Sequence, residues 1–145
     1  MIVRNIIDSK PIGEIITMKP TDTVRAATEV LAKHRIGAVI VSGDGEIVDG
    51  ILSERDIVRA LGVRGAEVLD LQIQDLMTAA VIGCHPGDTA ISVLERMTDG
   101  RFRHMPVIDA NKMVGVISIG DVVKARITEV QSENAALTDM IANSW

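Results

Sequence analysis

The sequence predicts a mixed α/β (α+β) protein in which two β-α-β-β-α repeats pack with pseudo-twofold symmetry and a further helix follows at the C-terminus. Three observations lead to this prediction. The 145-residue chain repeats itself at a shift of about 66 residues. Each copy alternates short apolar segments with stretches of helical spacing. With one Phe, one Trp and no Tyr, the core must consist of Ile, Val, Leu, Met and Ala, which suits buried strands.

Two motifs show the internal repeat most clearly. Residues 20–23 (PTDT) match residues 86–89 (PGDT) at a shift of 66. After one extra residue near Asp49 the shift becomes 65, and residues 50–59 match residues 115–124. Within the second match a Gly, a Ser and an Asp keep the same spacing in an apolar frame, which predicts two copies of one folding unit.

Each copy predicts the same order of elements. The strands are expected at 15–18, 37–41 and 47–52 in the first copy and at 81–84, 104–108 and 113–117 in the second. An Asp-Thr pair, a good N-cap signal, precedes the first helix of each copy, and Ser53 and Ser118 begin the last helices. Gly and Asn in the turns 42–45 and 109–112 tolerate the positive φ of tight hairpins.

These elements divide the chain into four parts. The expected parts are a first repeat (11–61), a partly helical linker (62–78), a second repeat (79–127) and a C-terminal helix (128–145). One repeat is too short to bury much apolar surface alone, so two should pack face to face. Symmetry then creates paired clefts between the repeats, and such clefts are preferred ligand sites.

Composition excludes several classes of protein. The net charge of −5 argues against a broad surface for nucleic acid, and the few aromatic residues argue against stacking of single-stranded bases. No apolar run approaches the roughly 20 residues that cross a bilayer, and residues 1–10 lack a signal-peptide core. A single Cys excludes an intramolecular disulfide framework. We expect a cytoplasmic protein with neither nucleic acid nor membrane as a partner.

The duplicated Ser-x-x-Asp motif has two interpretations. Ser53 with Asp56, and Ser118 with Asp121, have the spacing of a capping box at a helix N-terminus. Alternatively, the helix N-terminus faces a cleft, where its N–H groups favour a phosphate and the carboxylate accepts hydrogen bonds from a ribose diol. The two interpretations are compatible, because the Ser can cap while the Asp binds.

Three segments together resemble a tandem pair of CBS domains, also called a Bateman module, of the stand-alone bacterial type. They are residues 36–41 (IGAVIV), 50–56 (GILSERD) and 103–107 (RHMPV). The resemblance covers about residues 11–127. It implies the β-α-β-β-α fold twice over, and often a disc-shaped homodimer. It also implies binding of adenosine compounds such as AMP, ADP, ATP, NAD(H) or S-adenosylmethionine.

The resemblance assigns roles to particular positions. The Asp that starts the last helix of each repeat holds the ribose, and the hydroxyl residue three positions earlier contacts ribose or phosphate. A Thr at the end of the first strand helps to hold the base, although the second repeat has Gly83 at that position. The second strand contributes backbone groups to the base pocket. The nucleotide-binding residues so implied are Thr17, Gly37, Ala38, Val39, Ser53, Arg55, Asp56, Arg103, His104, Met105, Pro106, Ser118, Gly120 and Asp121.

A short cationic cluster surrounds Phe102. Arg101, Arg103 and His104 can bind a phosphate, since Arg binds it through two hydrogen bonds and His adds a donor. The alternative is a solvated loop that offsets the acidic surface. Further candidate cations are Arg55, Lys10 and Lys19.

The sequence gives little support for a metal site or for catalysis. Cys84 and His85 are adjacent on an expected strand, so their side chains point to opposite faces and are poorly placed to share a metal. No Walker loop, nucleophile elbow or GxGxxG turn is present. We therefore expect neither a metal site nor an enzyme.

The C-terminal segment shows a heptad-like pattern. Ile127, Val130, Asn134, Leu137 and Ile141 fit positions a, d, a, d and a, and an Asn at a central a position favours an in-register dimer. The alternative is an amphipathic helix that packs on its own domain.

The preferred hypothesis is a non-catalytic, energy-sensing module. It binds an adenosine nucleotide (AMP, ADP, ATP or NAD(H)) between the repeats, forms a homodimer and relays its state in trans to an unknown regulated protein. The alternative is a ligand-free module for dimerisation or partner docking.

Overall fold

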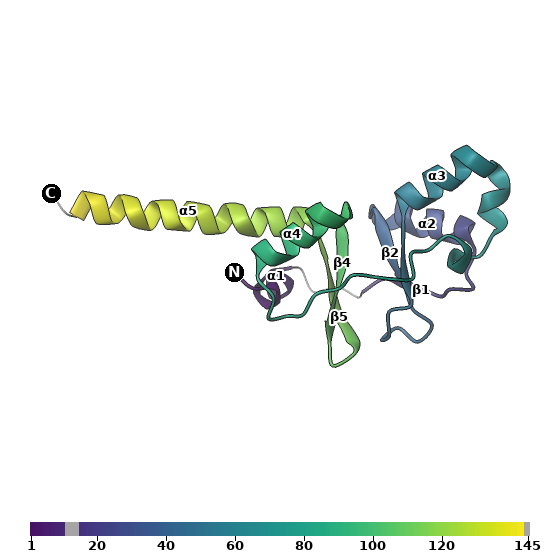
Figure 1. The fold of residues 1–145 in the computed structure, drawn as a ribbon, viewed down its shortest axis with the longest axis horizontal. Helices are drawn as coiled ribbons and strands as arrows, with labels where there is room; N and C mark the ends of the chain where they lie inside the picture. Colours follow the sequence, from purple (N-terminus) through teal and green to yellow (C-terminus); the bar gives the residue numbers. More distant parts are fainter. Residues whose placement is uncertain (11–14, 144–145) are drawn as a thin grey trace.

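The computed structural model describes residues 1–10 and 15–143 (Figure 1). Two repeats lie side by side, and a long helix projects from the second one. The expected start of the first repeat at residue 11 and the last two residues of the expected C-terminal helix, 144–145, lie outside the described residues.

The first repeat has the predicted β-α-β-β-α order. Its elements are β1 (Thr17–Met18), α2 (Val24–His34), β2 (Ala38–Val41), β3 (Gly50–Ser53) and α3 (Glu54–Arg64). The strand order is β1-β2-β3, with β1 parallel and β3 antiparallel to β2. Side chains at helical spacing on α2, among them Val24, Ala27 and Leu31, are buried against the apolar face of this sheet.

The second repeat contains α4 (Ala90–Gly100), β4 (His104–Asp109), β5 (Lys112–Ser118) and α5 (Ile119–Asn143). The predicted strand at 81–84 is wrong in extent, because only Cys84 pairs with β4, as an isolated parallel bridge to Val107. The Cys84 amide donates to the Pro106 carbonyl (3.0 Å), and its carbonyl accepts from Ile108 (2.7 Å). The preceding carbonyl, of Gly83, accepts a hydrogen bond from Arg96 of α4.

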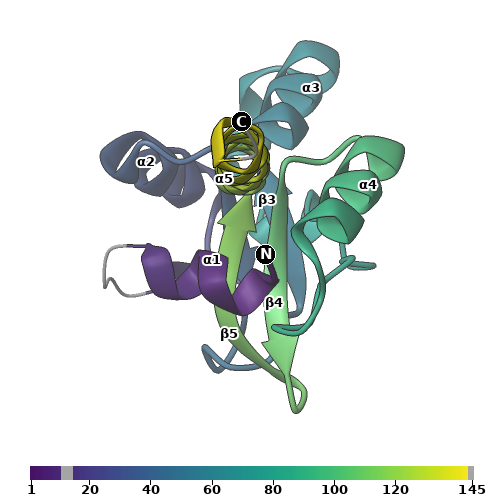
Figure 2. The same ribbon diagram turned by 90° about the vertical axis from the view of Figure 1, so that its left-hand side faces the viewer.

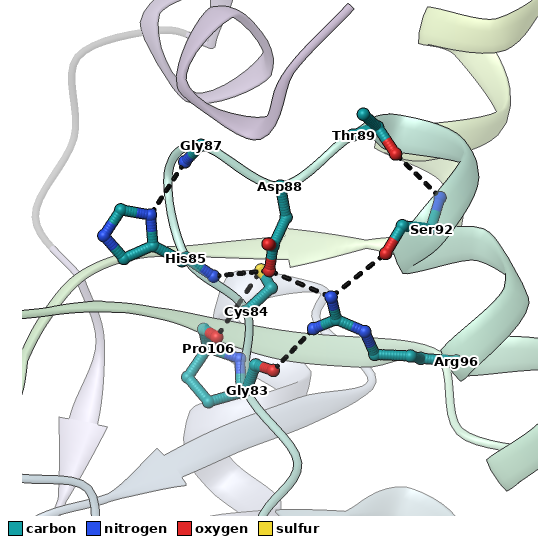
Figure 3. A network of polar contacts seen from close by, with 9 residues as sticks. All are labelled: Gly83, Cys84, His85, Gly87, Asp88, Thr89, Ser92, Arg96 and Pro106. Atoms are coloured by element: carbon teal, nitrogen blue, oxygen red, sulfur yellow. Dashed lines mark hydrogen bonds and ion pairs between the residues drawn. The ribbon is translucent and has the colours of Figure 1, made fainter.

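Arg96 connects α4 to the segment that precedes it (Figure 3). Its guanidinium donates to the Gly83 carbonyl (3.1 Å), the Asp88 carboxylate (3.0 Å) and the Ser92 hydroxyl (3.0 Å). Asp88 also accepts from the His85 amide (2.9 Å), and this hydrogen bond is the main cause of its lowered pKa. Arg96 thus stabilises the segment that replaces a regular first strand.

A short N-terminal helix, α1 (Val3–Ser9), completes the second repeat, although the sequence pattern does not predict it. Val3 and Ile6 are buried in the core of the second repeat, and Figure 2 shows α1 beside β5. In the same way the linker elements η1 (Ala66–Asp70) and η2 (Ile73–Asp75) bury Val68 and Ile73 in the core of the first repeat.

The N-terminal segment and the linker dock on the two repeats through equivalent backbone hydrogen bonds. The Val3 amide donates to the Asp88 carbonyl (2.8 Å), and the Ile73 amide donates to the Asp22 carbonyl (2.8 Å). The next amides, of Arg4 and Gln74, donate to the carbonyls of Pro86 and Pro20. Each loop with the PxDT pattern therefore receives the segment that precedes the first strand of the other repeat.

This docking explains the Gly that opens each Gly-x-x-Ser-x-x-Asp motif. A Cβ on Gly50 would lie 2.6 Å from the Met77 sulfur and 2.9 Å from the Thr78 carbonyl oxygen. A Cβ on Gly115 would lie 3.1 Å from the end of the Ile7 side chain. In both repeats the docked segment crosses the strand closely, but only at Gly50 is a backbone atom within 3 Å of the added Cβ.

The C-terminal helix is the continuation of the last helix of the second repeat, since α5 extends without a break over 25 residues. Val122 and Ala125 are buried, whereas residues 131–143 are exposed and extend away from both repeats (Figure 1). This part of α5 therefore does not pack on its own domain. None of the helices in the described ranges has the length and hydropathy of a membrane span.

We predict that Gly50→Ala lowers the free energy of unfolding by about 1–3 kcal/mol, because the new methyl group overlaps the Met77 side chain and the Thr78 carbonyl oxygen, and the carbonyl belongs to the backbone and cannot rotate away. Gly115→Ala is the matched control, with an expected loss below about 1 kcal/mol, since the Ile7 side chain can move away. Replacing Gly by Ala lowers the conformational entropy of the unfolded chain equally in both variants, so this effect cancels in the comparison. Urea denaturation measures both losses, and equal losses would contradict the close approach at Gly50.

Candidate functional site

Two clefts lie between the repeats, and each contains one of the duplicated acids. The Asp121 cleft, of about 730 Å³, combines Ser118 and Asp121 of the second repeat with residues 35–38 of the first. The Asp56 cleft, of about 360 Å³, combines Ser53 and Asp56 of the first repeat with residues 101–104 of the second. Each cleft therefore has the acid of one repeat on one side and the helix-to-strand turn of the other repeat on the opposite side.

Both acids also cap the helix that they begin. The Ser53 hydroxyl accepts from the Asp56 amide (3.2 Å), and Asp56 Oδ2 accepts from the Ser53 amide (3.0 Å). The corresponding distances for Ser118 and Asp121 are 3.1 and 2.9 Å. The capping interpretation is thus confirmed, and the same residues line the clefts. Each cap uses only Oδ2, and a carboxylate has about four acceptor positions, so the capped acid keeps the capacity to bind a ligand.

The two acids differ in their further contacts. Lys10, immediately after α1, donates through Nζ to Asp121 Oδ2 (2.9 Å) and to the Val116 carbonyl (3.0 Å). Burial alone would raise the pKa of Asp121, but the hydrogen bonds from the Ser118 amide and Lys10 outweigh burial and lower it. Within residues 1–10 and 15–143, the Asp56 side chain accepts a hydrogen bond only from Ser53.

Cations gather at the Asp56 cleft. Arg55 and Arg59 of α3 lie on one side, and Arg101 and Arg103 lie on the other, next to Phe102. Arg101 is the C-cap of α4 in the left-handed conformation (φ 56°), as Arg35 is for α2 (φ 53°). The cationic cluster and the Arg55 found in the sequence therefore come from different repeats and meet in one cleft.

Other expected site residues are distributed differently. Gly37, Ala38 and His104 line both clefts. The residues outside both linings are Thr17 on β1, the buried Val39, Met105 and Pro106 farther along their strands, and the exposed Gly120 on the first turn of α5.

Sequence reasoning missed the contributions of the segments that precede each first strand. Asp8, Ile15 and Ile16 line the Asp121 cleft, while Ala80 and Ile82 line the Asp56 cleft. Lys10 was a candidate only for a phosphate contact, not as a partner of Asp121. No local pattern marks Asp8 and Lys10, because burial of α1 in the core of the second repeat places them at this cleft.

His104 lies at the junction of the two clefts. A Cβ on Gly37 would lie 3.3 Å from His104 Cε1 and 3.5 Å from Glu54 Oε1, so these side chains meet across the repeats. Burial lowers the pKa of His104 and outweighs the opposing effects of Asp121 and Glu54. The neutral imidazole is therefore favoured between two acids.

The side chains of Cys84 and His85 lie in different environments, as expected for adjacent residues on an extended segment. The Cys84 thiol is buried, and burial raises its pKa to about 11, so the thiolate is scarce at neutral pH. His85 is exposed, with Nε2 3.4 Å from Asp109. The described residues contain no group of three His, Cys, Asp or Glu side chains placed to hold a metal ion.

Comparison with known proteins supports the repeated fold. The family model of the CBS domain matches the chain twice, over residues 3–63 and 73–128. A CBS-domain protein of Agrobacterium tumefaciens with a known crystal structure is 41% identical with a TM-score of 0.82, over 87% of this chain and 99% of that chain.

Two further relatives are informative. The CBS domain-containing protein CBSX3, mitochondrial, of Arabidopsis thaliana is 34% identical over 86% of this chain, which spans only 62% of the length of that relative. The CBS domain protein PAE2072 of Pyrobaculum aerophilum, whose structure is a complex with AMP, is 27% identical with a TM-score of 0.73, over 83% of this chain and 89% of that chain.

The environment of His104 gives a prediction. Its pKa should lie below the ordinary 6.5, and Glu54→Gln should lower it further, because the Glu54 charge favours the imidazolium. Glu67→Gln, which removes an exposed acid paired with Arg64, is the control and should have no effect. NMR titration of the imidazole signals measures these values, and an equal or higher pKa in the Glu54 variant would contradict the assignment.

The same shift sets the sign of a pH effect on stability. Because the folded pKa of His104 is depressed, the unfolded chain takes up the proton first as the pH falls. The stability contributed by neutral His104 is therefore present above about pH 6.5 and is lost as the pH falls toward the folded pKa. His104→Gln should reduce this loss in urea denaturation between pH 7 and pH 5.5.

Proposed function

Because the chain belongs to the CBS-domain family and carries that domain twice, we propose that it is a non-catalytic regulatory module that binds an adenosine nucleotide between its repeats. One observation carries the proposal: both duplicated acids, Asp56 and Asp121, line clefts that open between the two repeats. Each acid lies at a helix N-terminus with one carboxylate oxygen outside the cap.

The chemistry of these clefts suits an adenosine phosphate. The carboxylate accepts hydrogen bonds from the two ribose hydroxyls, and the helix N-terminus and arginines favour the phosphate. The turns at 35–38 and 101–104 offer backbone groups and apolar side chains to the base. AMP in the Pyrobaculum relative supports this ligand class, which includes AMP, ADP, ATP and NAD(H).

Regulation follows from the position of the ligand. Each cleft has walls from both repeats, so a ligand contacts both at once. If it binds one relative arrangement of the repeats more tightly, it shifts the population toward that arrangement. A partner protein that binds in trans then responds to the nucleotide, as an energy-sensing module requires.

The exposed part of α5 supports assembly as a homodimer. Ile127, Val130 and Leu137, at heptad positions a, d and d, are 52%, 42% and 56% exposed, and Asn134 occupies a central a position. Pairing with the same helix of a second copy buries these side chains and matches the two Asn134 amides in register.

We predict that the full-length protein binds AMP, ATP or NADH in isothermal titration calorimetry. The double variant Asp56→Asn/Asp121→Asn should lose at least about tenfold in affinity, because each diol loses a charged acceptor. The N-cap residues Ser53 and Ser118 remain, and the Asn amide oxygen can still accept the hydrogen bond from the Ser amide, so the fold is retained. Asp70→Asn, an exposed acid paired with Arg25, is the control. Absence of binding of these ligands and of S-adenosylmethionine to wild type would overturn the proposal in favour of a ligand-free docking module.

For the dimer, we predict that Leu137→Glu converts the protein to a monomer in sedimentation equilibrium, because two buried charges would face each other at a d position. Val63→Glu is the matched control, since Val63 is exposed on α3 and lies outside the helix pair. A monomeric wild type, or a Leu137 variant that remains dimeric, would contradict pairing through α5.

A further inference from the structure

The two clefts differ in charge, although the repeats that form them are alike. Among the described residues, the Asp121 cleft is lined by two cations, Lys10 and Arg35, and by two acids, Asp8 and Asp121. The charges of these four side chains therefore cancel.

The Asp56 cleft is lined by four arginines, at 55, 59, 101 and 103, against Glu54 and Asp56. Its described side chains therefore carry a net charge of about +2 at neutral pH. A nucleotide phosphate is attracted to this cleft and gains less in the Asp121 cleft.

The acid of the Asp121 cleft also has an internal partner. Lys10 Nζ lies 2.9 Å from Asp121 Oδ2, the same oxygen that accepts from the Ser118 amide. The lysine is held near this position by α1, because Val3 and Ile6 are buried in the second repeat. A second hydrogen bond, to the Val116 carbonyl, keeps the ammonium at the end of β5.

No lysine or arginine in residues 1–10 or 15–143 forms such an ion pair with Asp56. The segments 3–4 and 73–74 dock equivalently, at an offset of 70 residues, so that Val3 corresponds to Ile73. At the same offset Lys10 corresponds to Ala80, which lines the Asp56 cleft and carries no charge. At Asp56 a ribose diol meets a carboxylate that forms only its cap hydrogen bond within the described part of the chain, whereas at Asp121 the diol must share or displace an ammonium.

We propose that the clefts are not equivalent: the Asp56 cleft is the nucleotide-phosphate site, and Lys10 competes with the ribose for Asp121, so each chain binds one nucleotide tightly. This inference rests on the proposed function and specifies which cleft carries it. The volume of the Asp56 cleft, about 360 Å³, lies within the range of ligand pockets.

The first test uses AMP and adenosine as probes in calorimetry of the full-length protein. Wild type should bind one AMP per chain, at least about tenfold more tightly than adenosine, and the preference should fall with added salt. Asp121→Asn should keep this site, whereas Asp56→Asn should weaken it at least tenfold. Loss of the AMP site in the Asp121 variant but not in the Asp56 variant would overturn the proposal.

The second test isolates Lys10. In the Asp56→Asn background, Lys10→Met should strengthen adenosine binding to the remaining cleft several-fold, because the competing ammonium is gone and the uncharged probe does not depend on the charge of the lysine. Lys112→Met removes an exposed lysine that is paired with Glu46 outside both clefts, and it should leave affinity unchanged. Unchanged or weaker binding in the Lys10 variant would show that Lys10 is not a competitor, and would overturn this part.

These outcomes separate the inference from the proposed function. If wild type binds neither AMP nor adenosine, the proposed function fails. If wild type binds AMP equally well in both clefts, with two equivalent sites per chain, the proposed function stands and the inequality of the clefts is refuted.

Discussion

The reciprocal exchange of short segments between the repeats is the constraint on which the rest of this structure depends. Val3 and Ile6 enter the core of the second repeat, and Val68 and Ile73 enter the core of the first. Each repeat is too small to bury enough apolar surface alone, so each core is completed by residues from outside its own β-α-β-β-α unit. The same segments also contribute to the clefts, since Asp8 and Lys10 line the Asp121 cleft while Thr78 and Ala80 line the Asp56 cleft.

The clefts use backbone features that the fold requires anyway. Asp56 and Asp121 cap α3 and α5, and their position at a strand-to-helix junction brings them to the boundary between the repeats. Because each acid accepts a backbone hydrogen bond, its side chain is oriented before any ligand arrives. Asp56 and Asp121 can therefore cap their helices and bind a ligand at the same time.

The docked segments give the two repeats equivalent backbone contacts, but they also make the two clefts chemically different. The two docked segments have equivalent backbone contacts but different sequences, so Lys10 reaches Asp121 while Ala80 lies at the other cleft. Gly83, which precedes the Cys84 bridge, stands where the first repeat has Thr17, and a Cβ on Gly83 would lie 3.1 Å from the Pro106 carbonyl oxygen. Duplication gives a common backbone, and the side chains that were not duplicated make the two sites different.

The amino-acid sequence by itself determined the order of elements in each repeat, the caps at Ser53 and Ser118, and the pairing of an acid with each cap. These features depend on residues that are close in the chain, so local spacing reveals them.

Tertiary structure alone decided the docking of α1, the contraction of the expected strand at 81–84 to one bridge, and the Lys10–Asp121 ion pair. The two charges of that pair are 111 residues apart in the chain. Their contact depends on burial of a short helix in the opposite repeat, and no local pattern encodes such a contact because the energy that secures it comes from long-range packing.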